Sequence, residues 1–237
     1  MDPLAAKYPH LSPYNYVANN PMIFVDPNGK YLDDFTVRRN GTIEWTVTRD
    51  DHDRFYVENK KGALELAGVF CKNADGLIQL PSQFTFFSDD PRSSFGFSSK
   101  DAQESFVSGV GLAALMGALS ETNTWDMTIT SASLEDGSSP ITSRTHFGGV
   151  NFDMRYLKTN YSGDRGELQD VGIDVLRQNT LNEAMHKFGW KQLMSEVFAP
   201  DGLYGPYFLS RTTHDVKGKH CNHQHQGNFQ PHLIVNW

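Results

Sequence analysis

The sequence predicts an α+β fold, in which a β-rich segment precedes a domain of mixed helices and strands. Residues 31–95 contain runs such as TIEWTV and RFYV, in which polar and apolar residues alternate with the period of a strand. Beyond about residue 96 the pattern becomes mixed. A long apolar stretch and a stretch with helical spacing lie on either side of a further alternating run, WDMTITSA.

Residues 1–30 precede these elements and are rich in Pro, Asn and Tyr. They contain too few aliphatic residues to form a core, and the run Asp26-Pro27-Asn28-Gly29 is typical of a turn. From residue 31 to 96 we expect short strands that form a β-rich linker. Asn40-Gly41 and Asp51 to Asp53 are turn signals between its alternating runs.

Two helices are predicted in the second part of the chain. The first covers about 101–119 and contains FVSGVGLAALMGAL, which is long enough for a buried helix but too short to span a membrane. Ser99 and Asp101 are its candidate N-caps. The second helix covers about 179–198, where Leu181, Met185 and Phe188 lie near helical spacing. WDMTITSA is the strand between them.

The composition limits the function. The chain has 237 residues, a net charge of −7 and a sequence pI near 5.7. It lacks the basic footprint that nucleic-acid binding usually requires, so we expect no nucleic-acid partner. We also expect no membrane partner, because the most apolar stretch is too short to span a bilayer. The two cysteines, Cys71 and Cys221, form neither a metal-binding CxxC nor a disulfide framework, and a bridge between them stays open.

The first thirty residues resemble the end of the RHS-repeat-associated core. That family's typical motifs occur here in order: DPL, SPYNY, NNP and DPxG, within MDPLAAKYPHLSPYNYVANNPMIFVDPNGK. The resemblance implies that residues 1–30 are the tail of that core and that a variable C-terminal domain follows. In RHS proteins this domain is very often a toxin released into a competing cell, and its producer needs a cognate immunity protein.

Histidines are concentrated near the C-terminus, in the run HCNHQH. His223 and His225 are two residues apart, so on a strand both imidazoles face the same side. Upstream, in HFGGVNFD, His146 and Asp153 are separated by a glycine-containing bend. Together with one imidazole of the HxH they offer two nitrogens and one oxygen. Catalytic zinc sites commonly use three protein ligands and leave a fourth position open.

These motifs resemble those of the LAS metallopeptidases, which have an HxxGxxxD motif after a strand ending in ITS and a later HxH. Here the strand is MTITS and the motifs are HFGGVNFD and HQH. HCNHQH also has the HxxHxH spacing of the penicillin-insensitive murein endopeptidases. The resemblance covers residues 97–237 and implies a small antiparallel sheet flanked by helices. It further implies that His146, Asp153 and His225 bind Zn²⁺, that His223 is catalytic, and that His220 is an accessory active-site histidine.

The resemblance implies a zinc-dependent peptidoglycan peptidase, either an endopeptidase or a D-Ala-D-Ala-type carboxypeptidase, that is secreted or delivered to the periplasm of a target cell. Two features of the family are missing. TSASLEDG has no arginine to polarise the scissile carbonyl, for which Arg144 or Arg155 could substitute, and the second motif has no glutamate. A non-catalytic, Hedgehog-like zinc domain and a metal-dependent nuclease toxin stay open. We also expect a chain that starts near Phe97 to fold and bind zinc.

Overall fold

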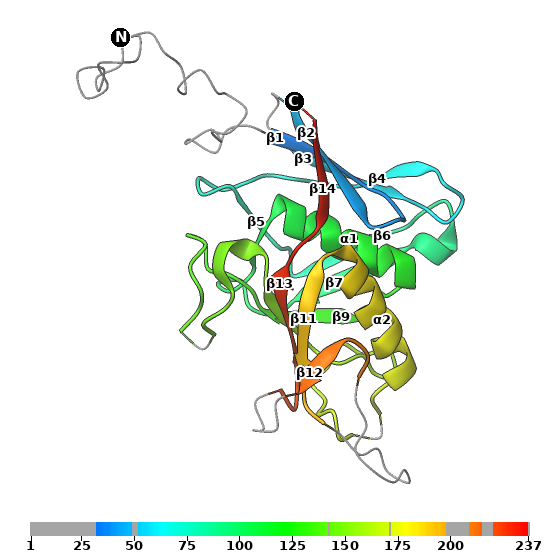
Figure 1. The fold of residues 1–237 in the computed structure, drawn as a ribbon, viewed down its shortest axis with the longest axis vertical. Coiled ribbons are helices and arrows are strands. Elements are labelled where there is room, and N and C mark those ends of the chain that lie inside the picture. Colours follow the sequence, from blue (N-terminus) through cyan, green and yellow to red (C-terminus); the bar gives the residue numbers. More distant parts are fainter. Residues whose placement is uncertain are drawn as a thin grey trace, which may run out of the picture.

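The protein has an α+β fold, seen here in a computed structural model (Figure 1). The structure describes residues 32–48, 52–141, 143–170, 172–197, 209–214 and 220–236. The predicted RHS tail at 1–30 lies outside the described residues.

Most of the described elements are strands. The strands are β1 Leu32–Val37, β2 Thr42–Thr48, β3 Asp53–Glu58, β4 Leu64–Phe70, β5 Leu77–Gln79, β6 Gln83–Phe86, β7 Phe95–Ser99, β8 Phe106–Ser108, β9 Met127–Ser131, β10 Phe152–Met154, β11 Trp190–Ser195, β12 Thr212–His214, β13 Gln224–Phe229 and β14 His232–Asn236. The α-helices are α1 Gly109–Thr122 and α2 Val175–Phe188, and the 3-10 helices are η3 Pro91–Ser93 and η4 Phe147–Gly149.

The strands form two larger sheets and a two-stranded ladder. The first sheet has five strands in the order β14-β2-β1-β3-β4, and the second has seven in the order β12-β11-β13-β10-β9-β7-β6. Both sheets are mixed, because β1 pairs with β3, β14 with β2, β7 with β9, and β11 with β12 in parallel. The sequence predicted one small antiparallel sheet, whereas the structure has two larger sheets that each contain parallel and antiparallel pairs. Within the larger sheet, however, β9, β10, β13 and β11 are antiparallel neighbours.

The first helix begins later than the sequence pattern predicts. Phe106 to Ser108 form β8, which pairs with β5, and the helix starts at Gly109. Its N-cap is Ser108, whose hydroxyl accepts a hydrogen bond from the Gly111 N–H at 3.0 Å. The prediction of a cap at Ser99 or Asp101 was wrong, because Phe106 and Val107 are as apolar as the helix that follows them.

The second helix is shorter than predicted. It ends at Phe188, and most of the last third of the predicted range 179–198 forms a strand instead. The Asp174 side chain caps the helix at its N-terminus, and Gly189 ends it with a φ of 133°. Residues 190–195 then form β11, which pairs with β13. The helix predicted to run to 198 was therefore wrong beyond residue 188. The glycine in FGW was the available stop signal, because φ > 0 is accessible to glycine at little cost.

One hydrophobic core joins the two parts of the chain. Its buried members include Phe35 and Phe55 from the first sheet, Leu112 from α1, and Phe97 and Trp190 from the second sheet. The chain passes from the second sheet to the first between β13 and β14, because β14 pairs with β2 in the first sheet (Figure 1). Residues 31–96 were expected to be a linker, yet strands of this range contribute side chains to the same core as residues 97–237.

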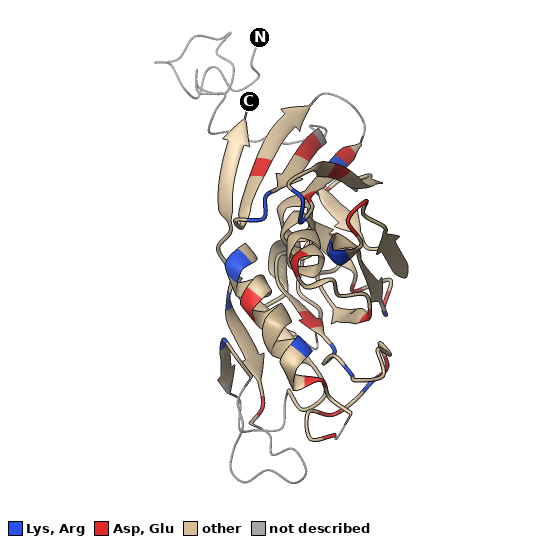
Figure 2. Ribbon diagram, turned by 90° about the vertical axis from the view of Figure 1, so that its right-hand side faces the viewer, with Lys and Arg blue, Asp and Glu red and all other residues tan. Residues whose placement is uncertain are grey.

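Among the described helices and strands, α2 and β3 carry both charge signs. In the view of Figure 2, Lys and Arg alternate with Asp and Glu along α2 and are spread over several loops. Cys71 and Cys221 are free thiols, so the bridge left open by the sequence is not formed. Of the described helices, none is long and apolar enough to cross a membrane.

Candidate metal centre

A row of side chains crosses the antiparallel part of the seven-stranded sheet. Ser131 of β9 pairs with Asp153 of β10, Asp153 pairs with His225 of β13, and His225 pairs with Met194 of β11. Directly opposed residues in antiparallel strands project from the same face. The other face packs against α2, where Gln178 donates a hydrogen bond to Gln224 at 3.2 Å. The row therefore lies on the face that α2 leaves uncovered.

His146 reaches this face from a tight turn. It directly precedes η4, in which Gly148 and Gly149 both have a φ of 66°. A Cβ atom on Gly149 would lie 2.5 Å from the backbone nitrogen of Ser108, so this close approach to the start of α1 requires glycine. The two glycines of HFGG thus fix the turn that presents His146 to Asp153.

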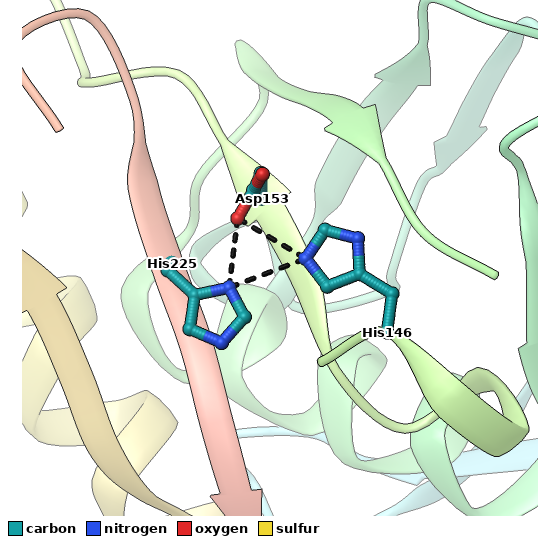
Figure 3. Close-up of side chains that lie close together, drawn as sticks. All are labelled: His146, Asp153 and His225. Carbon is teal, nitrogen blue, oxygen red and sulfur yellow. Dashed lines mark hydrogen bonds and ion pairs between the residues drawn. The ribbon is translucent and has the colours of Figure 1, made fainter. Parts of the chain in front are cut away.

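The three predicted ligands meet in the structure (Figure 3). His146 Nε2 lies 3.2 Å from both Asp153 Oδ1 and His225 Nδ1, and His225 Nδ1 lies 2.8 Å from Asp153 Oδ1. Donors placed tetrahedrally about 2.1 Å from a zinc ion are separated by about 3.4 Å. The observed separations are close to this value. His146, Asp153 and His225 therefore form a group that could hold a metal ion.

Hydroxyl groups hold the outward nitrogens of the two imidazoles. His146 Nδ1 lies 3.1 Å from Ser131 Oγ, and His225 Nε2 lies 3.3 Å from Thr145 Oγ1. When these outward nitrogens donate their N–H groups to the hydroxyls, the inward nitrogens keep their lone pairs for a metal. Such outer hydrogen bonds commonly fix the tautomer and orientation of ligand histidines. The donor set and its support thus fit a divalent cation such as zinc.

The electrostatics of Asp153 favour its role as an oxygen ligand. Burial, the largest influence, would raise the pKa of Asp153. The hydrogen bonds to His146 and His225 and the nearby imidazole charges together outweigh burial, and they hold the pKa below its ordinary value. Asp153 is therefore ionised at neutral pH and available to a cation.

His223 lies beside this group but not in it. Its Nε2 is 3.8 Å from Asp153 Oδ2, and its Nδ1 is 2.9 Å from the Asn222 side-chain oxygen. That oxygen accepts from Nδ1, so a neutral ring keeps its lone pair on Nε2, toward the site. Burial lowers the pKa of His223 below its ordinary value; the charge of Asp153 opposes this change, and the imidazoles of His225 and His146 support it.

His220 lies next to His223 rather than next to the three candidate ligands. The two ring centroids are 5.1 Å apart, whereas those of His220 and His225 are 6.5 Å apart. Tyr156 donates a hydrogen bond to the His220 carbonyl at 2.7 Å and so fixes the backbone there. Burial, with the charge of Glu196 adding to it, raises the pKa of Tyr156, so this phenol stays protonated as a donor.

Four residues near the site were missed by the sequence reasoning: Ser131, Thr145, Tyr156 and Glu196. Ser131 and Thr145 are near the quoted motifs, but nothing in the sequence assigns their hydroxyls to particular ring nitrogens. The candidate arginines remain unassigned. Arg155 donates to the Gly163 carbonyl at 2.7 Å, and Arg144 is exposed.

Comparison with family models, with curated proteins and with solved structures finds no match for this chain.

Proposed function

We propose that the protein is a zinc-dependent peptidoglycan peptidase that acts as the toxin domain of an RHS-repeat protein. The observation that carries the proposal is the group formed by His146, Asp153 and His225, with His223 beside it and outside it. Three ligands and a neighbouring acid–base residue are the parts that a hydrolytic zinc site needs. The motif resemblance to the LAS metallopeptidases supplies the substrate class.

The proposed chemistry divides between the metal and the chain. A bound zinc ion would lower the pKa of a coordinated water toward about 7 and polarise a carbonyl group. His146, Asp153 and His225 would hold the ion. His223, which is neutral at neutral pH and directs Nε2 toward the site, would accept a proton and return it to the leaving amine. His220 would assist beside it, with its backbone fixed by Tyr156.

The biological setting is proposed from the RHS motifs in residues 1–30. A peptidase of this kind would act on the cell wall in the periplasm of a target cell, and its producer would need a cognate immunity protein. The charges along α2 do not support the nuclease alternative, because basic and acidic residues are interleaved there (Figure 2). A nuclease would instead favour a continuous basic face.

The proposal is tested by measuring zinc content and cleavage on the purified full chain. We expect about one zinc ion per chain by mass spectrometry of metals, and release of peptide fragments from purified sacculi. The size of the fragments distinguishes an endopeptidase from a carboxypeptidase that releases only D-alanine. His146→Ala should lose both zinc and cleavage. Stoichiometric zinc without cleavage would favour the non-catalytic zinc domain, and degradation of plasmid DNA would favour the nuclease.

A further inference from the structure

Glu196 is a carboxyl group on the same sheet face as the candidate metal centre. It directly follows β11, in which Met194 pairs with His225. Continuing this antiparallel register by one pair on the same face places Glu196 opposite His223. In agreement with this placement, the charge of Glu196 acts on the pKa of both His223 and Tyr156.

The position of Glu196 differs from that of a metal ligand. One step of two residues along a strand is about 6.6 Å, so Glu196 flanks the row of ligands rather than joining it. The group whose donor atoms can share one ion consists of His146, Asp153 and His225, without Glu196. Glu196 is therefore placed to contact a bound molecule at the edge of the site.

The carboxyl group of Glu196 has an unsatisfied atom. Its Oε1 is buried and has no hydrogen-bond partner, and none of the ion pairs among the described residues involves Glu196. An unpaired buried carboxyl oxygen is costly, and native structures usually satisfy such atoms.

We propose that Glu196 forms a subsite for a primary ammonium group of the substrate. An ammonium group offers three N–H donors and a positive charge. It could therefore give the buried oxygen both a hydrogen bond and an ion pair. This inference rests on the proposed function and deepens it: the preferred substrates are stem peptides with a free amine close to the cleaved bond. Glu196 is a specificity-determining residue in this role, separate from the zinc ligands.

The test measures peptide binding to the zinc-loaded full chain by calorimetry, with mass spectrometry confirming that each peptide stays intact. Three versions of one short stem peptide are compared: one with only its α-amine free, one with only its side-chain amine free, and one with both amines acetylated. We expect at least one free-amine peptide to bind about tenfold or more tightly than the fully acetylated one, as a charge-assisted hydrogen bond provides.

Glu196→Gln should abolish this preference while keeping zinc content and melting temperature. The matched control is Glu167→Gln, an exposed glutamate whose loop contacts Cys221 through the Leu168 N–H; it should keep the preference. Equal affinities for all three peptides, no measurable binding of any, or a preference that survives Glu196→Gln would overturn the inference. An amine preference without cleavage of sacculi would refute the proposed function alone, whereas cleavage without an amine preference would refute the subsite alone.

Discussion

At the scale of single residues, the hydroxyl of Ser131 determines how His146 is presented. Ser131 lies on β9 and is paired with Asp153, so its Oγ reaches His146 Nδ1 from the strand next to the ligand strand. This contact fixes both the rotation of the ring and the nitrogen that faces Asp153 and His225, where a metal ion could bind. Loss of an outer partner of this type usually weakens metal binding without unfolding the protein.

Ser131→Ala should therefore reduce zinc affinity about 10- to 100-fold, measured by competition with a chelator. Ser99→Ala is the control, because Ser99 is a buried serine on the nearby strand β7 whose hydroxyl has no hydrogen-bond partner. It should leave zinc affinity unchanged. Equal affinities for the wild type and Ser131→Ala would show that the hydroxyl does not support the ligand.

His223→Ala separates an enzyme from a zinc binder. The side chain lies beside the ligand group and outside it, so its removal should preserve zinc content and reduce turnover on sacculi about 10²- to 10⁴-fold. Loss of zinc would instead make His223 a ligand. Full turnover with full zinc would remove His223 from the mechanism and leave His220 as the remaining histidine beside the site.

The spacing of the motifs predicted that His146, Asp153 and one imidazole of the HxH would lie together, and the choice of His225 came from the resemblance to the LAS metallopeptidases. HxH on a strand aims alternate residues at one face, and the glycines of HFGG permit the bend that brings His146 back to Asp153. The hydroxyls of Ser131 and Thr145 and the carboxyl of Glu196 could not be assigned from spacing, because each depends on which strands are neighbours in the sheet.

At the scale of elements, the sequence predicted the type of most segments better than their ends. The strands containing TIEWTV, RFYV and MTITS are present as β2, β3 and β9. The start of α1 was misplaced because an apolar run cannot by itself distinguish β8 from the helix that follows. The end of α2 was misplaced because β11 continues the apolar spacing after Gly189, and its strand conformation also depends on pairing with the distant strands β12 and β13.

A polar cluster connects three elements of the first sheet. Asp53 of β3 accepts a hydrogen bond from the Asp33 N–H of β1 at 2.8 Å, and Lys72, which follows β4, lies 2.5 Å from Asp33 and 3.3 Å from Asp53. Burial raises the pKa of Asp53 to about 6, although the charge of Lys72 opposes the change. The cluster therefore contains two buried carboxyl groups and one lysine ammonium group.

This cluster makes stability depend on pH. Because the pKa of Asp53 is higher in the folded chain than in the unfolded chain, the folded state binds the extra proton between about pH 4 and pH 6, and its stability falls as pH rises through that range. Asp53→Asn should remove this dependence. The difference in free energy of unfolding, variant minus wild type, should therefore increase by roughly 3 kcal/mol from pH 4 to pH 8. Urea unfolding at several pH values measures this difference.

The control is Asp34→Asn on the neighbouring strand β1, at a half-buried position paired with Arg54. Between about pH 4 and pH 6, its free energy of unfolding should change with pH by the same amount as that of the wild type. If Asp53→Asn also runs parallel to the wild type, Asp53 is ionised in the folded protein throughout and the proposed origin of the pH dependence is wrong.

At the scale of the whole molecule, the two sheets and both helices share one core. Removal of the residues before Phe97 should therefore destabilise the rest of the chain. The sequence suggested that a chain starting near Phe97 would fold. Such a chain would lack the strands that carry Phe35 and Phe55 against α1, and it would leave β14 without β2. Composition could not reveal this, because β14 and β2 are distant in sequence.

We now expect a chain that starts at Phe97 to be insoluble and to bind no stoichiometric zinc, because it exposes the core face of α1. A chain that starts at Tyr31 keeps all the described strands and is the control; it should be soluble and bind zinc. Solubility after expression and metal content are the measurements. A soluble, zinc-loaded product from Phe97 would show that residues 97–237 fold without the first sheet.

The strand that joins the two sheets also has a consequence for the order of events during synthesis. His225 lies on β13, and β14 follows it directly to pair with β2, so that His232 meets Thr42 across 190 residues. Contacts between such distant segments form slowly, because a long loop must close first. A chain that emerges from its amino end would hold an incomplete first sheet and only two of the three candidate ligands until residues 225–236 appear. Completion of the first sheet and the capacity to bind a metal ion would then arrive together.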